Sequence, residues 1–578
     1  MLRGLFKTKD LDSILAAAAR PGVGLRRSLG PFHVTLLGIG AIIGAGIFAT
    51  VGEAAAGVGG IPGAGPSLML SFVITAIVCG FTALCYAEFA SMVPISGSAY
   101  TYAYSTLGEL IAWIIGWDLI LEYAIGNTAV AISWANYFRS LLSGLGLDFP
   151  WWLATDFRTA ALDPAILAKA PTILGVHVVF NVLAFFIVAA LTVVLVWGIR
   201  ESAAFNAGMV VVKIIVLVFF VCVAFYYVSP AEMRANWTPF QPTGWNGTLA
   251  GAAVVFFAYI GFDAVSTVAE ETRNPSRDLP IGIIASLLIC TVIYIVVAAV
   301  FTGLIPYGDL VTRMASEKAE PLVMALERAA PHQVWATNIV AFGSVVAHTA
   351  VLLVFQMGQP RIFFSMARDG LLPRVFASVH PRFKTPHVTT ILTGLVVGVI
   401  AAVSNISEMV ALTNIGTLFA FVLVCLGIPI LRFKDPHRPR PFRVPLGPLF
   451  LPVLGAVSCL GLMYYLPPSS WWRFVGWLIL GLAVYTSYGY SHSGIGRVLG
   501  RSERTMFVLK VAAVGLTALA FGLFVIPHDI SFSDLLRRAF DAADPARSRA
   551  LVGFAMIVSG AAVALISSFL AAIMKPNR

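Results

Sequence analysis

The residues of this sequence that could do chemistry lie inside apolar stretches. Residues 38–56, GIGAIIGAGIFATVGEAAA, carry the triplet Gly44-Ala45-Gly46 at their middle. A glycine in a helix costs about 1 kcal/mol relative to alanine, so the triplet predicts a break in a membrane-spanning helix. Such a break frees backbone N–H and C=O groups for a ligand and leaves a helix N-terminus that attracts a carboxylate. The alternative interpretation is close helix packing through small residues.

A second interruption lies in residues 251–271, GAAVVFFAYIGFDAVSTVAEE. Gly261 stands at mid-span there, and Asp263 is an acid inside the membrane. Two interrupted segments at matching places in two halves of a chain indicate a substrate site at the bilayer midplane. The alternative is that both glycines serve packing, but the coincidence of the two favours the site.

Lys213 lies deep in the apolar run FNAGMVVVKIIVLVFFV. A lysine at that depth is costly and by default functional, and burial disfavours its charged form, which favours a proton that is gained and lost. The alternative is a side chain that snorkels to the membrane surface.

Other polar residues inside the spans admit two interpretations each. Glu122 is either a proton-relay group or an inward-facing acid satisfied by hydrogen bonds. Asp263 could link span six to a neighbouring helix, and its other interpretation depends on the resemblance described below. We interpret Glu88 and Asp118 as structural. His348 is better explained as a hydrogen-bonded core histidine than as a specificity residue.

Composition places the chain in a membrane. The 578 residues are 59% hydrophobic and 11% charged, against about 25% charged in soluble domains. Six cysteines lie in apolar runs without a CxxC or Cys/His cluster, and no phosphate loop or nucleophile elbow occurs. We therefore expect no metal, no cofactor and no enzyme activity. The formal charge is +10, and the basic residues lie in the loops between spans. The positive-inside rule for membrane proteins explains this distribution better than nucleic-acid binding does.

Apolar runs of roughly 20 residues recur along the chain and predict an all-α polytopic membrane protein. The third and eighth are longer than a bilayer requires and are expected to be long tilted helices. A short amphipathic helix is expected around Ala319–Arg328. The fourteen expected spans are 31–56, 67–92, 98–139, 173–198, 203–228, 248–269, 279–305, 334–366, 386–404, 407–431, 447–467, 471–490, 507–527 and 549–573.

Loop charges predict the orientation. The loops after spans eight, ten and twelve are rich in arginine and share a side with the basic segment 1–30, so both termini are expected in the cytoplasm. Residues 31–228 and 248–431 are expected to be two repeats of five spans. An odd number of spans makes the repeats inverted. Residues 447–573 add four further spans, and we expect a bacterial plasma membrane.

Five stretches in order resemble one known family: GIGAIIGAGIF, YAEFASMVPISGSAYTYAY, GWDLILEYAIGNTAVA, FFAYIGFDAVSTVAEETRNPSRDLPIGI and GQPRIFFSMARDGLLP. Over about residues 30–435 the chain resembles the amino acid–polyamine–organocation superfamily, and within it the cationic amino acid transporters and their bacterial relatives. The resemblance implies two inverted five-helix repeats whose first and sixth helices are broken.

The resemblance also implies roles for residues at the two breaks. N–H groups around Gly44, Ala45 and Gly46 would meet the α-carboxylate of an amino acid. Many relatives have serine where this chain has Ala45, so a hydroxyl contact is absent. The carbonyls of Ile42, Phe257, Ala258 and Ile260 would meet the α-ammonium. The expected substrate site also includes Ile43, Tyr259 and Gly261.

The resemblance implies that Lys213 stands where sodium binds in sodium-dependent relatives, with Thr349 facing it. Lys213, Glu122, Asp263 and Thr349 are thus the expected proton-coupling residues. The sequence predicts a secondary active transporter for amino acids with cationic or small neutral side chains, driven by protons. A uniporter or exchanger of the same fold, or a channel or amino-acid sensor built on it, remains an alternative.

Overall fold

The apolar runs fold into helices. The computed structural model describes residue 8 and residues 29–57, 60–93, 98–173, 176–198, 203–314, 320–493, 503–525 and 547–573. Within them, seven helices are long and apolar enough to cross a membrane, or eight if the bent pair Phe450–Tyr464 and Pro468–His492 is one span. The all-α polytopic fold is confirmed, together with breaks in its first and sixth spans. The count of fourteen spans and the division into repeats remain predictions.

The first half of the chain contains two short helices and a pair of short antiparallel strands between its third and fourth spans. Its elements are α3 (Pro31–Ile42), η1 (Gly46–Thr50), α4 (Val51–Ala56), η2 (Gly65–Ser67), α5 (Leu68–Met92), α6 (Ser98–Thr106), α7 (Glu109–Gly144), η3 (Trp151–Leu153), α8 (Phe157–Ala161), α9 (Pro164–Lys169), β1 (Thr172–Ile173), β2 (Val176–His177), α10 (Val182–Trp197), α11 (Ala203–Tyr227) and α12 (Pro230–Asn236).

The second half begins with the other broken helix. Its elements are α13 (Gly244–Val255), η4 (Phe256–Tyr259), η5 (Asp263–Glu271), α14 (Pro275–Leu304), α15 (Tyr307–Met314), α16 (Pro321–Ala329), α17 (Val334–Arg368), η6 (Arg374–Ala377), α18 (His387–Val403), α19 (Ile406–Lys434), α20 (Phe450–Tyr464), α21 (Pro468–Val484), η7 (Tyr485–Gly489), α22 (Tyr490–His492), α24 (Glu503–Val525) and α26 (Arg547–Ile573).

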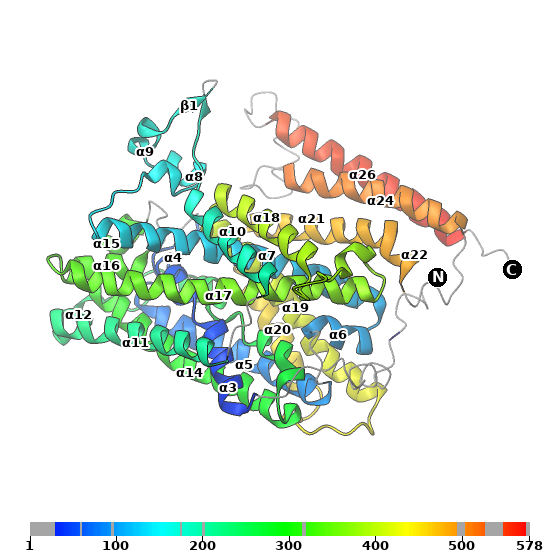
Figure 1. Cartoon of the computed structure of the whole chain (residues 1–578), viewed down its shortest axis with the longest axis horizontal. Coiled ribbons are helices and arrows are strands. Elements are labelled where there is room, and N and C mark those ends of the chain that lie inside the picture. Colours follow the sequence, from blue (N-terminus) through cyan, green and yellow to red (C-terminus); the bar gives the residue numbers. More distant parts are fainter. Residues whose placement is uncertain are drawn as a thin grey trace.

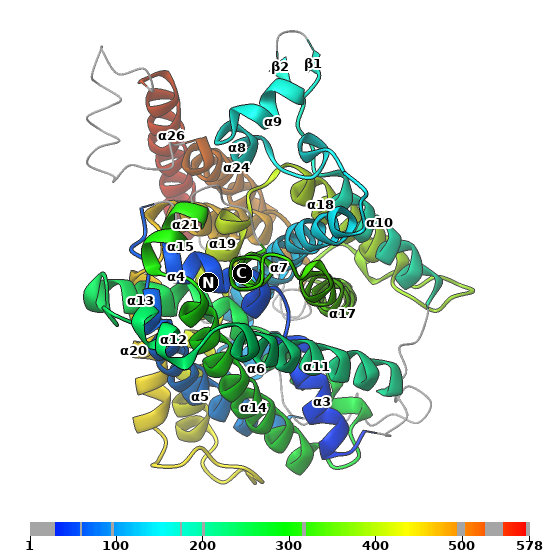
Figure 2. The same ribbon diagram turned by 90° about the vertical axis from the view of Figure 1, so that its left-hand side faces the viewer.

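Helix α17 runs across the molecule in Figure 1, and the view turned by 90° looks nearly along its axis (Figure 2). In both views α24 and α26 lie side by side at the edge of the molecule. Glycines allow this pair to touch, because a Cβ built on Gly515 would lie 2.7 Å from the Gly560 carbonyl oxygen. The helices α24 and α26 therefore form a packed pair at the periphery, while both broken helices are largely buried inside the protein.

Two expected spans have different boundaries in the structure. Residues 98–139 are not one long tilted helix, because α6 ends at Thr106 and α7 starts at Glu109. Gly108 between them has a φ of +99°, which favours glycine and ends the helix. The expected fourth span begins only at Val182, since strand β1 (Thr172–Ile173) pairs with strand β2 (Val176–His177) before it.

Other expectations are confirmed. The eighth span is a single long helix, α17, of 35 residues. The amphipathic helix expected near residue 320 is α16, which is preceded by a further short helix, α15. Most of the expected N-terminal segment 1–30 lies outside the described residues.

A buried ion pair fixes one end of the bundle. Glu88 at the end of α5 is fully buried, and its carboxylate pairs with the Arg432 guanidinium of α19. The Glu88 carboxylate also accepts a hydrogen bond of 2.7 Å from the Val444 N–H, in the loop that follows α19. Because every charge here has a partner, the structural interpretation of Glu88 fits its surroundings.

Candidate functional site

The first span breaks at the glycine triplet. Helix α3 ends at Ile42, and Ile43 is extended with φ −74° and ψ 104°. The helix resumes at Gly46 as a wide π turn, Gly46–Thr50, and continues as α4. The main chain at Ile43 and Gly44 is thus released from regular helix, and its peptide groups can face a ligand.

The sixth span breaks next to it. Helix α13 narrows to the 3₁₀ turn Phe256–Tyr259, Ile260 is extended, and Gly261 has a φ of +121°. A side chain is strained at that φ, and a Cβ on Gly261 would also lie 2.7 Å from the Ala41 carbonyl oxygen. The Asp263 carboxylate accepts a hydrogen bond of 3.2 Å from the Gly261 N–H, which stabilises the break.

The two breaks lie in direct contact. A Cβ built on Gly46 would lie 2.2 Å from the Ala258 Cα. The Tyr294 hydroxyl of α14 bridges them, at 2.9 Å from the Ile42 carbonyl oxygen and 3.0 Å from the Ala258 carbonyl oxygen. A phenol carries one hydrogen and can donate to only one carbonyl at a time. The other carbonyl can then accept from a further donor, such as an ammonium group.

The break region is closed to solvent. Ile42, Ile43 and Ala45 are at most 2% exposed, and Phe257 is 5% exposed. Gly44 packs against Val351 of α17, since a Cβ at Gly44 would lie 2.7 Å from that side chain. A ligand at the breaks is therefore enclosed on all sides in this arrangement, and its entry requires the helices to move.

Lys213 of α11 lies beside the first break. Its side chain is fully buried, and its Nζ donates hydrogen bonds of 2.6 Å to the Gly40 carbonyl and 2.9 Å to the Ile43 carbonyl. Both acceptors belong to the end of α3, where carbonyl groups have lost their helical partners. The ammonium group points into the protein, which contradicts the snorkelling interpretation.

Thr349 and His348 of α17 have partners on α7. The Thr349 hydroxyl accepts a hydrogen bond of 3.0 Å from the Trp134 indole N–H. His348 is fully buried; its Nδ1 lies 2.5 Å from the Ser344 carbonyl oxygen and its Nε2 lies 2.7 Å from the Ser133 hydroxyl. Because a carbonyl only accepts, the neutral ring carries its hydrogen on Nδ1 and accepts at Nε2. This agrees with a hydrogen-bonded core histidine.

The intramembrane acids gather on the other side of the sixth-span break. Glu122 of α7 is 3% exposed and Asp263 is 1% exposed. Asp263 and Asp118 both act electrostatically on the Glu122 carboxyl, which lies beside the Thr417 hydroxyl of α19. The structure thus places Asp263 and Asp118 within electrostatic reach of Glu122.

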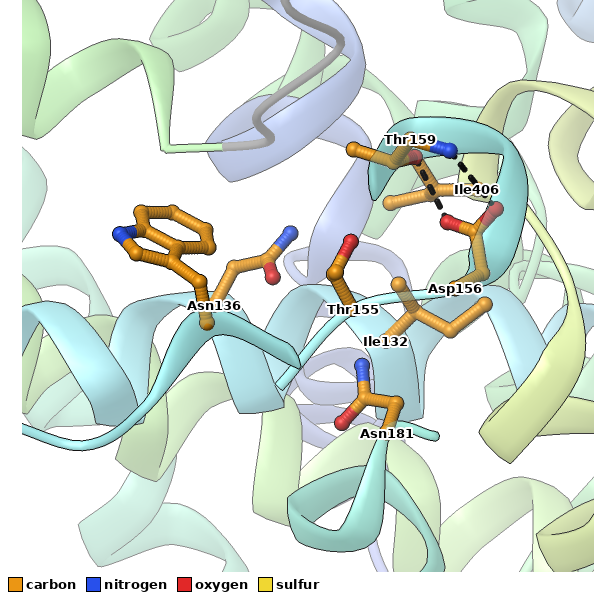
Figure 3. A pocket seen from close by; sticks show the side chains of 8 residues that line it. Ile132, Asn136, Thr155, Asp156, Thr159, Asn181 and Ile406 are labelled. Atoms are coloured by element: carbon orange, nitrogen blue, oxygen red, sulfur yellow. Dashed lines mark hydrogen bonds between the residues drawn. The ribbon is translucent and has the colours of Figure 1, made fainter. Parts of the chain in front are cut away.

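A small polar pocket lies away from both breaks, where α7, α8, α10 and α19 meet (Figure 3). The Asp156 carboxylate in it accepts hydrogen bonds from the N–H and hydroxyl groups of Thr159, at the start of α8. Its acceptors are thereby used in capping that helix. The lining residues are Ile132, Asn136, Trp151, Thr155, Asp156, Thr159, Asn181 and Ile406.

Comparison with known proteins decides the family. A family model described as amino acid permease matches residues 29–485. The chain belongs to the amino acid permease family. The resemblance to the amino acid–polyamine–organocation superfamily is confirmed. The similar proteins are transporters and not enzymes, so this permease is not an enzyme.

Three relatives show the range of this similarity. The branched-chain amino acid permease of Bacillus subtilis is 44% identical over 497 residues, which are 86% of this chain and 100% of that protein. The methylthioribose transporter of the same organism is 42% identical over 492 residues, 85% and 99% of the two chains. The vacuolar cationic amino acid transporter 2 of Arabidopsis thaliana is 40% identical over 448 residues, 76% and 65% of the two chains.

Sequence reasoning missed two polar groups that hold the breaks of the permease. Tyr294 lies in the run ICTVIYIVVA, and Asn414 of α19 donates hydrogen bonds from its side-chain amide to the carbonyls of Ala253 (2.8 Å) and Val254 (3.1 Å). A phenol or amide inside an apolar span requires a partner. That requirement could have marked both residues, although it does not identify the partners.

Replacement of Tyr294 by phenylalanine tests whether a ligand shares its carbonyls. The change removes the donor for the Ile42 and Ala258 carbonyls and should destabilise the empty permease by roughly 1–3 kcal/mol. A substrate ammonium that meets the same carbonyls would restore part of this loss. We expect a lower melting temperature without substrate and a larger substrate-induced rise than in the wild type.

The control is Tyr485→Phe, which removes a hydrogen bond of 2.8 Å to Glu109 at a buried position outside both breaks. That variant should show the wild-type rise on substrate addition. An unchanged rise in Tyr294→Phe as well would mean that the ammonium group binds elsewhere.

Proposed function

We propose that this permease takes up neutral L-amino acids, branched-chain side chains included, and that protons drive the uptake. Transport proceeds by alternating access around the two broken helices, in a bacterial plasma membrane with both termini in the cytoplasm. The proposal follows the arrangement of the two repeats expected from the sequence. It rests chiefly on one observation, the contact of the Lys213 ammonium with the first break.

The position of Lys213 supports proton coupling. Its Nζ binds the Gly40 and Ile43 carbonyls, which is the kind of contact a metal cation makes with the end of a helix. A lysine can lose its charge by releasing a proton, whereas a bound ion must leave. Proton release would loosen the end of α3 and favour a different arrangement of the first break. Thr349, on the neighbouring helix α17, is the other residue expected to take part in this step.

The two breaks offer complementary ends for an amino acid. The N–H groups of Gly44, Ala45 and Gly46 suit a carboxylate, as a helix N-terminus does. The carbonyls of Ile42 and Ala258, with those of Phe257 and Ile260 beside them, suit an ammonium. Backbone groups supply both contacts, so recognition of the α-amino and α-carboxyl groups does not depend on the substrate side chain.

The side chains around the breaks support a neutral substrate. Ile43, Phe257, Ile260 and Val351 are apolar, and no acidic side chain lies in either break segment, Ile42–Gly46 or Phe257–Gly261. A buried cationic side chain requires a paired charge. A relative that is 44% identical is a branched-chain amino acid permease, which supports the same substrate class.

Reconstitution into liposomes tests the proposal. Radiolabelled leucine should accumulate when the outside is acidic, and isoleucine and valine should compete with it. Leucine methyl ester and N-acetyl-leucine should compete poorly, since each lacks one of the two charged groups, and arginine should compete poorly because its charge finds no partner.

Three results would argue against this function. Effective competition by both leucine derivatives would exclude recognition through the α-amino and α-carboxyl groups. Accumulation that ignores the proton gradient would leave an exchanger or uniporter, and flux that does not saturate would indicate a channel.

A further inference from the structure

Asp118 is a buried carboxyl group that neither the breaks nor the ion pairs of the permease use. It lies on α7 one helical turn before Glu122, and its side chain is fully buried. Residues four apart on a helix have Cβ atoms about 5–6 Å apart. Asp118 and Asp263 both act on the Glu122 carboxyl, so the three acids form one cluster.

Neither oxygen of Asp118 has a hydrogen-bond partner among the described residues. The facing helix α19 approaches through Gly416, where a Cβ would lie 2.9 Å from the Asp118 Oδ1. An ionised carboxylate without a donor inside a protein costs several kcal/mol. A proton on Asp118 removes this cost, so the neutral form is favoured in this arrangement.

The titratable groups around the cluster come from five elements, including α6, whose Tyr102 ring lies 6.5 Å from the Tyr86 ring. Glu122 and Tyr123 belong to α7, Asp263 to η5 and Tyr86 to α5, and Arg361 of α17 acts on Tyr123. Helix α19 has no ionisable side chain between Met409 and Val424.

The Tyr86 hydroxyl is a second sign that polar groups meet here. It is fully buried without a hydrogen-bond partner among the described residues, and Asp263 and Glu122 are its strongest electrostatic neighbours. The cluster thus contains two acceptor oxygens, those of Asp118, and one hydroxyl donor, that of Tyr86, without hydrogen-bond partners among the described residues. Such groups are free to take part in proton transfer.

Asp263 connects this cluster to the sixth-span break. Its Oδ1 accepts the hydrogen bond from the Gly261 N–H. A charged acceptor makes this bond stronger than a neutral one does. A proton on Asp263 therefore weakens the hydrogen bond that stabilises the backbone conformation of Gly261. The charge of the cluster is thereby linked to the geometry of the substrate site.

We infer that Asp118 is the last carboxyl of a proton relay that runs from Asp263 through Glu122 toward the N-terminal end of α7, which the proposed orientation places on the cytoplasmic side. When this end opens, the O–H bond of Asp118 breaks and its proton goes to water, which leaves a carboxylate. The proton of Glu122 then moves to Asp118, and that of Asp263 moves to Glu122. The inference rests on the proposed proton coupling.

Asp118→Asn tests the relay in proteoliposomes. The amide keeps the shape and polarity of the side chain but cannot release a proton. We expect proton-driven accumulation of leucine to fall about tenfold or more, a loss equivalent to about 1.4 kcal/mol of coupling. The pH dependence of uptake should flatten, while counterflow exchange of leucine continues.

The matched control is Glu109→Gln. Glu109 is a fully buried acid on the same helix, but Tyr485 and Tyr104 donate hydrogen bonds to it. This variant should keep the wild-type pH profile. Asp118→Glu keeps a titrating group and should accumulate leucine with a shifted pH midpoint, which tests the relay even if Asp118→Asn does not fold.

The outcomes separate this inference from the proposed function. If the wild type couples leucine to protons and Asp118→Asn keeps the wild-type pH profile, Asp118 is structural and only the relay is overturned. An unshifted midpoint in Asp118→Glu has the same meaning. If wild-type uptake ignores the proton gradient, the proposed function fails, and the relay fails with it.

Discussion

Lys213→Arg is expected to bind leucine but not to accumulate it. The guanidinium stays charged at any working pH, so it would hold the Gly40 and Ile43 carbonyls in every state of the cycle. A group that binds two conformations equally shifts no equilibrium and transmits no driving force. Gradient-driven uptake should therefore fall to the level of liposomes without protein.

Lys213→Met should lose accumulation for a different reason. Methionine has a similar length but no charge and no donor, so the Gly40 and Ile43 carbonyls lose their buried partner at a cost of about 1–3 kcal/mol each. Some counterflow exchange can survive, because exchange needs alternating access but no coupling. Proton-driven uptake measured beside counterflow separates the two effects.

Lys510→Met is the control, because Lys510 is an exposed lysine of the peripheral helix α24. It should accumulate leucine as the wild type does. Wild-type accumulation in both Lys213 variants would leave Lys213 a structural residue and return coupling to Glu122 and Asp263.

The breaks could be predicted because their cause is local. Gly44, Gly46 and Gly261 weaken a helix wherever they occur, and an apolar span has few other reasons to contain them at its middle. The pairing of the two breaks through Tyr294 was not predictable. Its partners are carbonyls of residues 252 and 36 positions away along the chain, and such contacts arise from the fold.

The predicted span boundaries were wrong where the chain leaves the helical conformation without a clear change in composition. Residues 98–139 are apolar on both sides of Gly108, so composition did not separate α6 from α7. The paired strands β1 and β2 likewise precede the apolar run of α10, and nothing in the sequence separates them clearly from it. Asp118 lies in a stretch that resembles the family, and the sequence alone favoured a structural role for it. Only the folded structure shows that its carboxyl lacks a hydrogen-bond partner among the described residues and faces Gly416 of α19.

Gly46→Leu is expected to abolish substrate binding in a permease that still inserts and folds. The sequence suggested that a side chain there would fill the space of the substrate carboxylate. The contacts suggest a second, stronger effect, because a Cβ at Gly46 would lie 2.2 Å from the Ala258 Cα. Backbone cannot rotate away as a side chain can, so the two breaks must separate, and the N–H donors move away from the carbonyls of the sixth span.

Graded substitutions test this separation. Overpacking usually costs roughly 1–3 kcal/mol, so Gly46→Ala should lower leucine affinity about tenfold or more. Gly80→Leu in α5 is the matched control, since no atom lies within 4 Å of a Cβ at that glycine. Binding to detergent-purified protein with one symmetric size-exclusion peak is the measurement. Wild-type affinity in folded Gly46→Leu would mean that the contact of the two breaks is not part of the binding site.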